Sequence, residues 1–128
     1  MITRLAHVSL YVRDYDEALR FYTDVLGLEL RNDRPIGDNY RWVTVAPPGQ
    51  AGVEIVLHRP GDPHAHAAFI GAQPGMVFHT DDCRAEVARL AEKGVEIARQ
   101  PHEVPWGIQA VFRDLYGNTH VLVQPAGA

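Results

Sequence analysis

Cysteine is nearly absent from this chain, since Cys83 is the one cysteine among 128 residues. A single thiol excludes a disulfide within the chain and a metal cluster held by several thiolates. Long apolar runs are missing too, and none approaches the roughly 20 residues that a membrane-spanning helix needs. The first residues lack the apolar core of a signal peptide. We therefore expect a cytoplasmic protein without a membrane segment.

The sequence also has no excess of positive charge. It carries 12 Lys and Arg against 16 Asp and Glu, which gives a formal net charge of −4. This balance offers no basic surface for nucleic acid, so we expect no nucleic-acid partner. The hydrophobic content of 46% and charged content of 22% are typical of a globular protein. The length predicts a single domain whose small core would gain from a partner.

What the chain does contain begins with a strand pattern at residues 5–12. Apolar residues fill one face of this predicted strand: Ala6, Val8, Leu10 and Val12. The other face carries His7, Ser9 and Tyr11, which are polar but uncharged. A solvent-facing strand would carry more Lys and Glu, so this face is typical of a cavity or a wet groove.

A helix follows the first strand. Asp14 and Glu17 form a capping-box pattern that predicts the helix start, and Gly27 predicts its end after about Leu26. Three more strands are expected at 28–30, 40–45 and 52–57, with a polar turn at 31–39. Residues 59–74 are rich in proline and predict an arm, with one short helix at 65–70.

The same pattern then restarts. A strand is expected at 76–80, a helix capped by Asp81 or Asp82 and ended by Gly94, and a strand at 95–97. The interval from Asp14 to Gly27 equals that from Asp81 to Gly94, which indicates an internal repeat. We therefore predict an α+β fold of two tandem βαβββ modules whose sheets curl around a central cavity. The modules are expected at about 1–58 and 75–125, joined by the arm.

Residues 110–123 predict a final β-hairpin, with turn chemistry at Asp114 and at the Gly117–Asn118 pair. Its Phe-Arg-Asp-Leu-Tyr-Gly-Asn at 112–118 resembles the Phe-x-Asp-Pro-x-Gly-Asn hairpin of the vicinal oxygen chelate superfamily. That superfamily includes glyoxalase I, bleomycin-resistance proteins, fosfomycin-resistance transferases and extradiol dioxygenases. Residues 7–14, 18–22 and 25–28 are similar to its first module. The resemblance covers nearly the whole chain and implies the paired βαβββ fold.

The resemblance also implies a metal site with four ligand positions. His7 matches the ligand on the first strand, and Glu54 matches the acidic or amide ligand on the fourth. The third position is Pro74 or Gly75, depending on which aspartate caps the second helix. The fourth, three residues after the Gly-Asn asparagine, is Val121. Since these last positions cannot coordinate, we expect no resident cofactor.

Two histidines are the candidate catalytic residues, His7 and His79. By strand alternation His79 should share a face with Gly75 and Val77 and point into the cavity. It could replace a missing ligand, act as an acid or base near neutral pH, or only bind a ligand through a hydrogen bond. A divalent metal held by His7, Glu54 and His79 is the alternative to a metal-free site.

Five further residues are candidate ligand-binding residues: Ser9, Tyr11, Tyr40, Trp42 and Trp106. Trp106 precedes Gly107, which is expected to keep its loop mobile enough to close over a ligand. Three functions are considered, of which the third is an interaction module without a ligand pocket. The first is metal-free binding of a small apolar or aromatic molecule, for sequestration or for acid–base chemistry. The second is a metal-dependent lyase, isomerase or dioxygenase. A homodimer is expected in each case.

Overall fold

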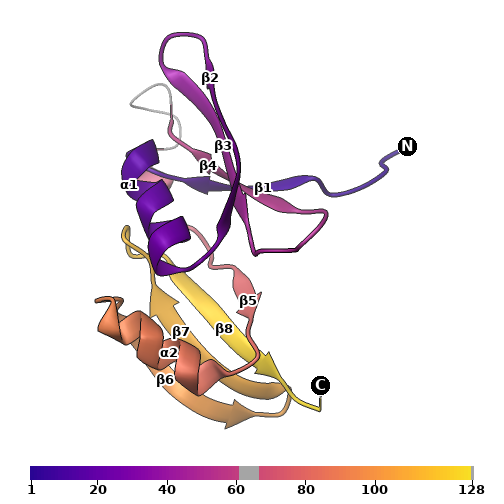
Figure 1. Ribbon diagram of the computed structural model, residues 1–128, viewed down its shortest axis with the longest axis vertical. Coiled ribbons are helices and arrows are strands. Elements are labelled where there is room, and N and C mark those ends of the chain that lie inside the picture. Colours follow the sequence, from indigo (N-terminus) through magenta and orange to yellow (C-terminus); the bar gives the residue numbers. More distant parts are fainter. Residues whose placement is uncertain (61–66, 128) are drawn as a thin grey trace. The chain divides into compact units, whose positions relative to one another are not determined.

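The computed structural model describes residues 1–60 and 67–127, which divide into two compact units, Met1–Gly71 and Ala72–Ala128. Each unit contains a four-stranded sheet and a helix in the order β-α-β-β-β (Figure 1). This arrangement confirms the predicted α+β fold of tandem βαβββ modules. Within the described residues, no helix is long and apolar enough to cross a membrane.

The first unit is built from β1, α1, a π-helical continuation η1, and three more strands. Their bounds are β1 His7–Tyr11, α1 Tyr15–Leu19, η1 Arg20–Val25, β2 Glu29–Ile36, β3 Tyr40–Ala46 and β4 Glu54–His58. The strand order is β1-β4-β3-β2, in which β1 is parallel to β4 and the other pairs are antiparallel. Part of the short helix expected at 65–70 lies outside the described residues. The described part forms the 3₁₀ turn η2 at Ala67–Phe69.

The second unit repeats this topology. Its elements are β5 Val77–His79, α2 Cys83–Glu92, β6 Ile97–Val104, β7 Gly107–Arg113 and β8 Thr119–Pro125. The strand order is β5-β8-β7-β6, and the first strand again runs parallel to the last. The internal repeat read from the sequence is therefore a repeat of structure.

The helix starts follow from their capping residues. Asp14 Oδ1 accepts the backbone N–H of Glu17 at 2.9 Å, and Asp82 Oδ1 accepts that of Ala85 at 3.0 Å. Each carboxylate thereby satisfies an N–H that the first helical turn leaves unpaired. Asp82, rather than Asp81, is thus the cap of α2.

Two strands are longer than predicted. The polar turn expected at 31–39 is wrong, because residues 31–36 belong to β2 and only 37–39 turn. Likewise β6 continues beyond residue 97 to Val104. Both are edge strands that contain a proline, Pro35 or Pro101. Because the outer side of an edge strand has no ladder partner, a missing N–H there costs little.

The final hairpin is fixed by a buried polar network. Asp114 Oδ1 accepts the backbone N–H groups of Tyr116 and Asn118, both at 2.9 Å, and Asp114 Oδ2 accepts the Asn118 amide, also at 2.9 Å. His120 is fully buried beside them, with Nε2 3.6 Å from Asp114 Oδ2, and its Nδ1 accepts the N–H of Met76 at 3.1 Å. His120 is therefore a structural residue on the side that faces α2.

Candidate functional site

The first sheet has one face packed under α1 and an open face on the opposite side. Alternation along β1 buries Leu10 and Val12 on the helix side, which leaves the predicted polar face of the strand open. The register aligns His7 with Glu54 and Tyr11 with His58 on neighbouring strands. The strand register places twelve residues on the open face of the first unit, of which Thr44 and Val56 are themselves buried: His7, Ser9, Tyr11, Asn32, Arg34, Ile36, Tyr40, Trp42, Thr44, Glu54, Val56 and His58.

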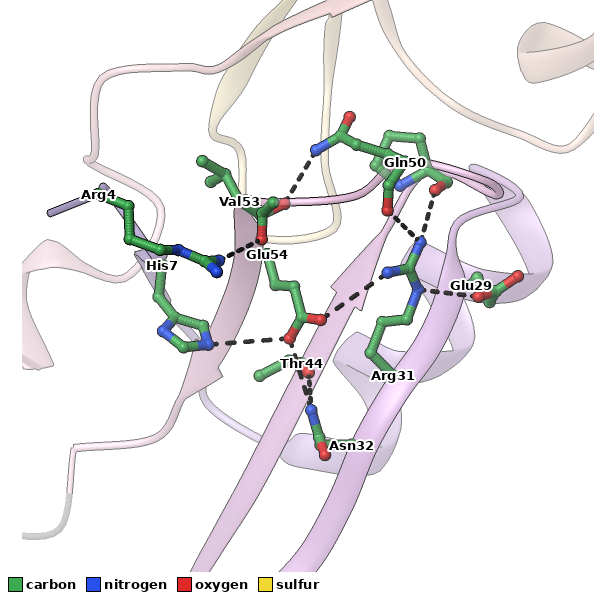
Figure 2. A network of polar contacts seen from close by, with 11 residues as sticks. Arg4, His7, Glu29, Arg31, Asn32, Thr44, Gln50, Val53 and Glu54 are labelled. Carbon is green, nitrogen blue, oxygen red and sulfur yellow. Dashed lines mark hydrogen bonds and ion pairs between the residues drawn. The ribbon is translucent and has the colours of Figure 1, made fainter.

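His7 and Glu54 form the polar end of this face (Figure 2). His7 Nε2 lies 3.8 Å from Glu54 Oε1, with 37% of the His7 side chain and 21% of the Glu54 side chain exposed. Asn32 Nδ2 donates to Thr44 Oγ1 at 2.9 Å and to Glu54 Oε1 at 3.5 Å. The structure therefore brings together the two predicted metal ligands, and it adds Asn32 and Thr44, which the sequence pattern did not single out.

Arg31 approaches Glu54 from the other side. Its Nη1 lies 3.8 Å from Glu54 Oε2, and its Nε lies 2.8 Å from Glu29 Oε1. Its Nη2 donates to the carbonyls of Pro47 at 3.1 Å and Gln50 at 2.8 Å, in the turn between β3 and β4 (Figure 2). The guanidinium is thus held in place by several oxygen atoms. It places a permanent positive charge beside the carboxylate of Glu54.

Aromatic rings fill the rest of the face. The His7 and Trp42 rings meet edge to face, with centroids 5.1 Å apart. Farther along the strands, Tyr40 Oη and His58 Nδ1 share a hydrogen bond of 3.2 Å, and the Tyr11 ring lies 5.5 Å from that of His58. Burial raises the pKa of Tyr40, and Tyr15 raises it further, so the phenol keeps its proton.

Ser9 lies between these two groups, exposed on the same strand. His58 is the last residue of β4 and shares a face with Glu54. Its bond to Tyr40 makes it part of the aromatic group. The register of β1 with β4 is the signal that could have identified it, because a parallel pairing aligns Tyr11 with His58.

The second sheet has an open face of different character. The register aligns Val77 with Val121 and Val121 with Val111, on the side opposite α2. His79 is exposed on the same side of β5 as Val77, as predicted from alternation. His79 also borders an open hollow of about 710 Å³ whose lining includes Thr80, Asp81, Gln124, Pro125 and Gly127.

Trp106 occupies the turn between β6 and β7. Its side chain is 56% exposed, and its Nε1 donates to Gln109 Oε1 at 2.9 Å. The expectation that Gly107 keeps a loop mobile is wrong, because Gly107 begins β7 and pairs with Pro125. A Cβ at Gly107 would lie 2.0 Å from the Gln124 carbonyl oxygen, so glycine permits close backbone packing here.

The residues present do not fit the four-ligand metal centre of the vicinal oxygen chelate superfamily. Since Asp82 caps α2, the third ligand position is Gly75, where even a Cβ would lie 1.6 Å from the Thr119 carbonyl oxygen. The fourth position, Val121, has no donor atom. In the described ranges 1–60 and 67–127, no three His, Cys, Asp or Glu side chains form a group that could hold a metal ion.

Comparisons with known proteins agree with this scaffold. The model of the Glyoxalase/Bleomycin resistance protein/Dioxygenase superfamily matches residues 4–122. An uncharacterized protein of Shewanella frigidimarina is 40% identical over 125 residues, which cover 94% of this chain and 92% of that protein. The crystal structure of UcmS2 is 38% identical with a TM-score of 0.85 and covers 96% of this chain and 98% of its own. The structure of TnmS3, an antibiotic binding protein from Streptomyces sp. CB03234, is 37% identical with a TM-score of 0.83 and covers 98% of both chains.

Proposed function

Because the chain belongs to the glyoxalase/bleomycin resistance protein/dioxygenase superfamily, we propose that it binds and sequesters an aromatic organic molecule without the help of a metal. One observation carries this proposal, namely the open face of the first unit, where aromatic rings surround a few fixed polar groups. Ligand sites are typically apolar and aromatic surfaces with a small number of well-placed hydrogen-bonding groups. The fold alone would not select a function, since one scaffold hosts many.

The similarity to TnmS3 supports the class of ligand. TnmS3 is an antibiotic binding protein, and this chain is 37% identical to it over 98% of both chains. A small aromatic antibiotic therefore suits the open face better than a phosphorylated or strongly anionic metabolite. At the polar end Arg31 is already paired with Glu29 and Glu54, while the exposed Arg34 pairs across the strands with Trp42.

The predicted binding residues take distinct roles in this proposal. The rings of Trp42, Tyr40 and Tyr11 provide surfaces for a planar ligand, and each such contact contributes about 0.5–1.5 kcal/mol beyond its burial. His7 and Ser9 provide hydrogen-bonding groups that orient the ligand. Trp106, in the second unit, is proposed as a further contact, since its side chain is 56% exposed and its Nε1 donates to Gln109 Oε1.

Tryptophan fluorescence tests this proposal, because Trp42 and Trp106 are the two tryptophans of the chain. In Trp106→Phe, Trp42 becomes the sole reporter. The variant is titrated with a panel of aromatic antibiotics and with non-aromatic antibiotics of similar size. We expect saturable quenching by at least one aromatic compound and none by the others. Quenching that never saturates, or equal quenching by both classes, would contradict the proposal.

Acid–base chemistry on the bound molecule is a second candidate, favoured by the contact between His7 Nε2 and Glu54 Oε1 at 3.8 Å. A carboxylate beside an imidazole orients it as a proton acceptor. His79, on the open face of the second unit, is the other candidate base. Recovery of the ligand by mass spectrometry decides between the two functions, because a sequestering protein returns it unchanged and an enzyme converts it. Conversion that persists in both His7→Ala and His79→Ala would exclude this chemistry.

A metal-dependent lyase, isomerase or dioxygenase is the alternative function, and of its three expected ligands, His7, Glu54 and His79, the first unit brings His7 and Glu54 together. Elemental analysis of untagged protein tests it. Stoichiometric metal that is lost in His7→Ala would support the metal-dependent enzyme and contradict the metal-free proposal. If the protein retains no metal after loading with Zn²⁺, Ni²⁺, Mn²⁺ or Fe²⁺, the metal-dependent enzyme is excluded.

We further propose that the protein acts as a homodimer, since a chain of 128 residues buries a limited core and gains from association. Analytical ultracentrifugation at micromolar concentration should give twice the 14.2 kDa mass of one chain. A species with the mass of a single chain would contradict this assembly.

A further inference from the structure

We infer that Arg31 supplies, beside Glu54, the positive charge that a metal ion brings in metal-dependent members of the superfamily, and that it thereby excludes divalent metals from the open face of the first unit. The inference rests on the proposed function, because it concerns the same face. It explains why His7 and Glu54 can remain adjacent while the other two ligand positions hold Gly75 and Val121.

The position of Arg31 depends on a β-bulge. The pairing of β2 with β3 slips between Leu30 and Asn32, so Arg31 is the extra residue. In a regular strand Arg31 and Asn32 would point to opposite faces, whereas a bulge re-aims one side chain. Here both reach Glu54, Asn32 through Nδ2 at 3.5 Å and Arg31 through Nη1 at 3.8 Å.

The guanidinium is also anchored on its far side. The Pro47 and Gln50 carbonyls accept from Nη2, and the Glu29 carboxylate lies 2.8 Å from Nε. The Arg31 side chain is 20% exposed, and moving it aside would break its hydrogen bonds to the Pro47 and Gln50 carbonyls. A surface arginine on a free stem could swing away from an arriving metal ion, but this one is fixed by its own hydrogen bonds.

Charge repulsion then follows from the geometry. A Zn²⁺ ion bound to Glu54 would sit about 2.0–2.2 Å from a carboxylate oxygen. The Arg31 Nη1 atom lies 3.8 Å from Glu54 Oε2, so the two cations would be a few ångströms apart in a partly buried site. Like charges at such distances repel strongly even at a high effective dielectric constant. The Glu54 carboxylate therefore interacts with Arg31, His7 and Asn32 and not with a metal ion.

Zinc titration by calorimetry tests the inference, with Arg31→Gln and Arg31→Lys as the informative pair. Arg31→Gln removes the charge and keeps a polar side chain, so we expect its affinity for Zn²⁺ to rise by about tenfold or more. Arg31→Lys keeps the charge but loses the fixed fork of donors, so its affinity for Zn²⁺ should rise less than that of Arg31→Gln. The gain should disappear in Arg31→Gln combined with Glu54→Gln.

Arg41 offers a matched control on the same sheet. Its guanidinium pairs with Asp16 at 2.9 Å and Asp33 at 2.8 Å, so Arg41→Gln also releases two carboxylates, away from His7. This variant should gain no affinity for Zn²⁺. An equal gain in Arg41→Gln, or equal affinities of Arg31→Gln and the unaltered protein, would overturn the inference.

Two further measurements keep the test decisive. If Arg31→Gln does not fold, Arg31→Met replaces it. The unaltered protein and Glu54→Gln also give a test that needs no Arg31 variant. Tight zinc binding by the unaltered protein, lost in Glu54→Gln, would overturn the inference. Binding of aromatic ligands is measured in a separate titration in the presence of EDTA. Failure of ligand binding therefore counts against the proposed function, and failure of the zinc results counts against the role of Arg31.

Discussion

The two units share one topology but differ in their open faces. In the first unit, neighbouring β1 and β4 place His7 beside Glu54. In the second, neighbouring β5 and β8 place Val77 beside Val121. One face therefore carries a network of paired charges with aromatic rings, and the other carries valines together with the polar side chains of His79 and Gln109. The backbone repeat has been kept while the chemistry of the two halves has diverged.

The backbone itself reinforces this difference at one point. His7 precedes its helix cap, Asp14, by seven residues, and Gly75 precedes Asp82 by the same interval. His7 has room for its ring, but a Cβ at Gly75 would lie 1.6 Å from the Thr119 carbonyl oxygen. The second unit therefore has no room for the matching ligand. A histidine at position 75 would therefore need the backbone around Thr119 to move.

The largest expected effect comes from this pair of positions. Gly75→Ala forces a methyl group against backbone atoms, and overpacking of this kind costs roughly 3 kcal/mol or more. His7→Ala trims an exposed side chain and should change the free energy of unfolding by about 0.5 kcal/mol or less. Urea denaturation followed by circular dichroism measures both. Similar losses in the two variants would show that the two positions are equivalent after all.

Ligand affinity should separate the two faces next. Trp42→Ala removes a ring from the first face, and we expect the dissociation constant of an aromatic ligand to rise about tenfold. Val111→Ala shortens an apolar side chain on the second face and should change the dissociation constant by about threefold or less. Isothermal titration calorimetry gives both values. A larger loss in Val111→Ala would move the site to the second unit.

The smallest expected effect concerns the first residue of each helix, Tyr15 in α1 and Cys83 in α2, which are both buried. Burial raises the pKa of Cys83 from 9.0. The folded protein then holds the thiol proton more tightly than the unfolded chain. Its contribution to stability is therefore complete below pH 9 and falls as pH rises through the folded pKa.

Cys83→Ala should remove this part of the alkaline decline, while Tyr15→Phe should leave it in place. Urea midpoints measured between pH 8 and 10.5 provide the comparison. If the stability of Cys83→Ala falls with rising pH as much as that of the unaltered protein, the decline is caused by other groups.

Much of the fold follows from local signals in the sequence. Asp14 and Asp82 cap helices as such residues usually do, and the turn chemistry from Asp114 to Asn118 predicts the final hairpin. The family resemblance is confirmed by the match over residues 4–122. These signals are readable because each depends on residues close together in the chain.

The features that the sequence did not predict depend on pairing between distant segments. Residues 31–36 look like a turn because they are polar and contain proline, and only the ladder with β3 makes them a strand. The bulge that aims Arg31 at Glu54 is a property of that ladder, so Arg31 could not be identified beforehand. The sequence around Gly107 is typical of a mobile loop, but the close contact of Gly107 with Gln124 depends on the pairing of β7 with β8.

Ligand binding by the metal-free protein tests the central claim most directly. The Trp106→Phe variant is treated with EDTA, dialysed, and titrated with the aromatic ligand identified in the panel, with and without added Zn²⁺, while Trp42 fluorescence is followed. We predict saturable binding with the same dissociation constant in both titrations. Binding that is absent from the EDTA-treated protein and returns with Zn²⁺ would contradict a metal-free site on the open face of the first unit.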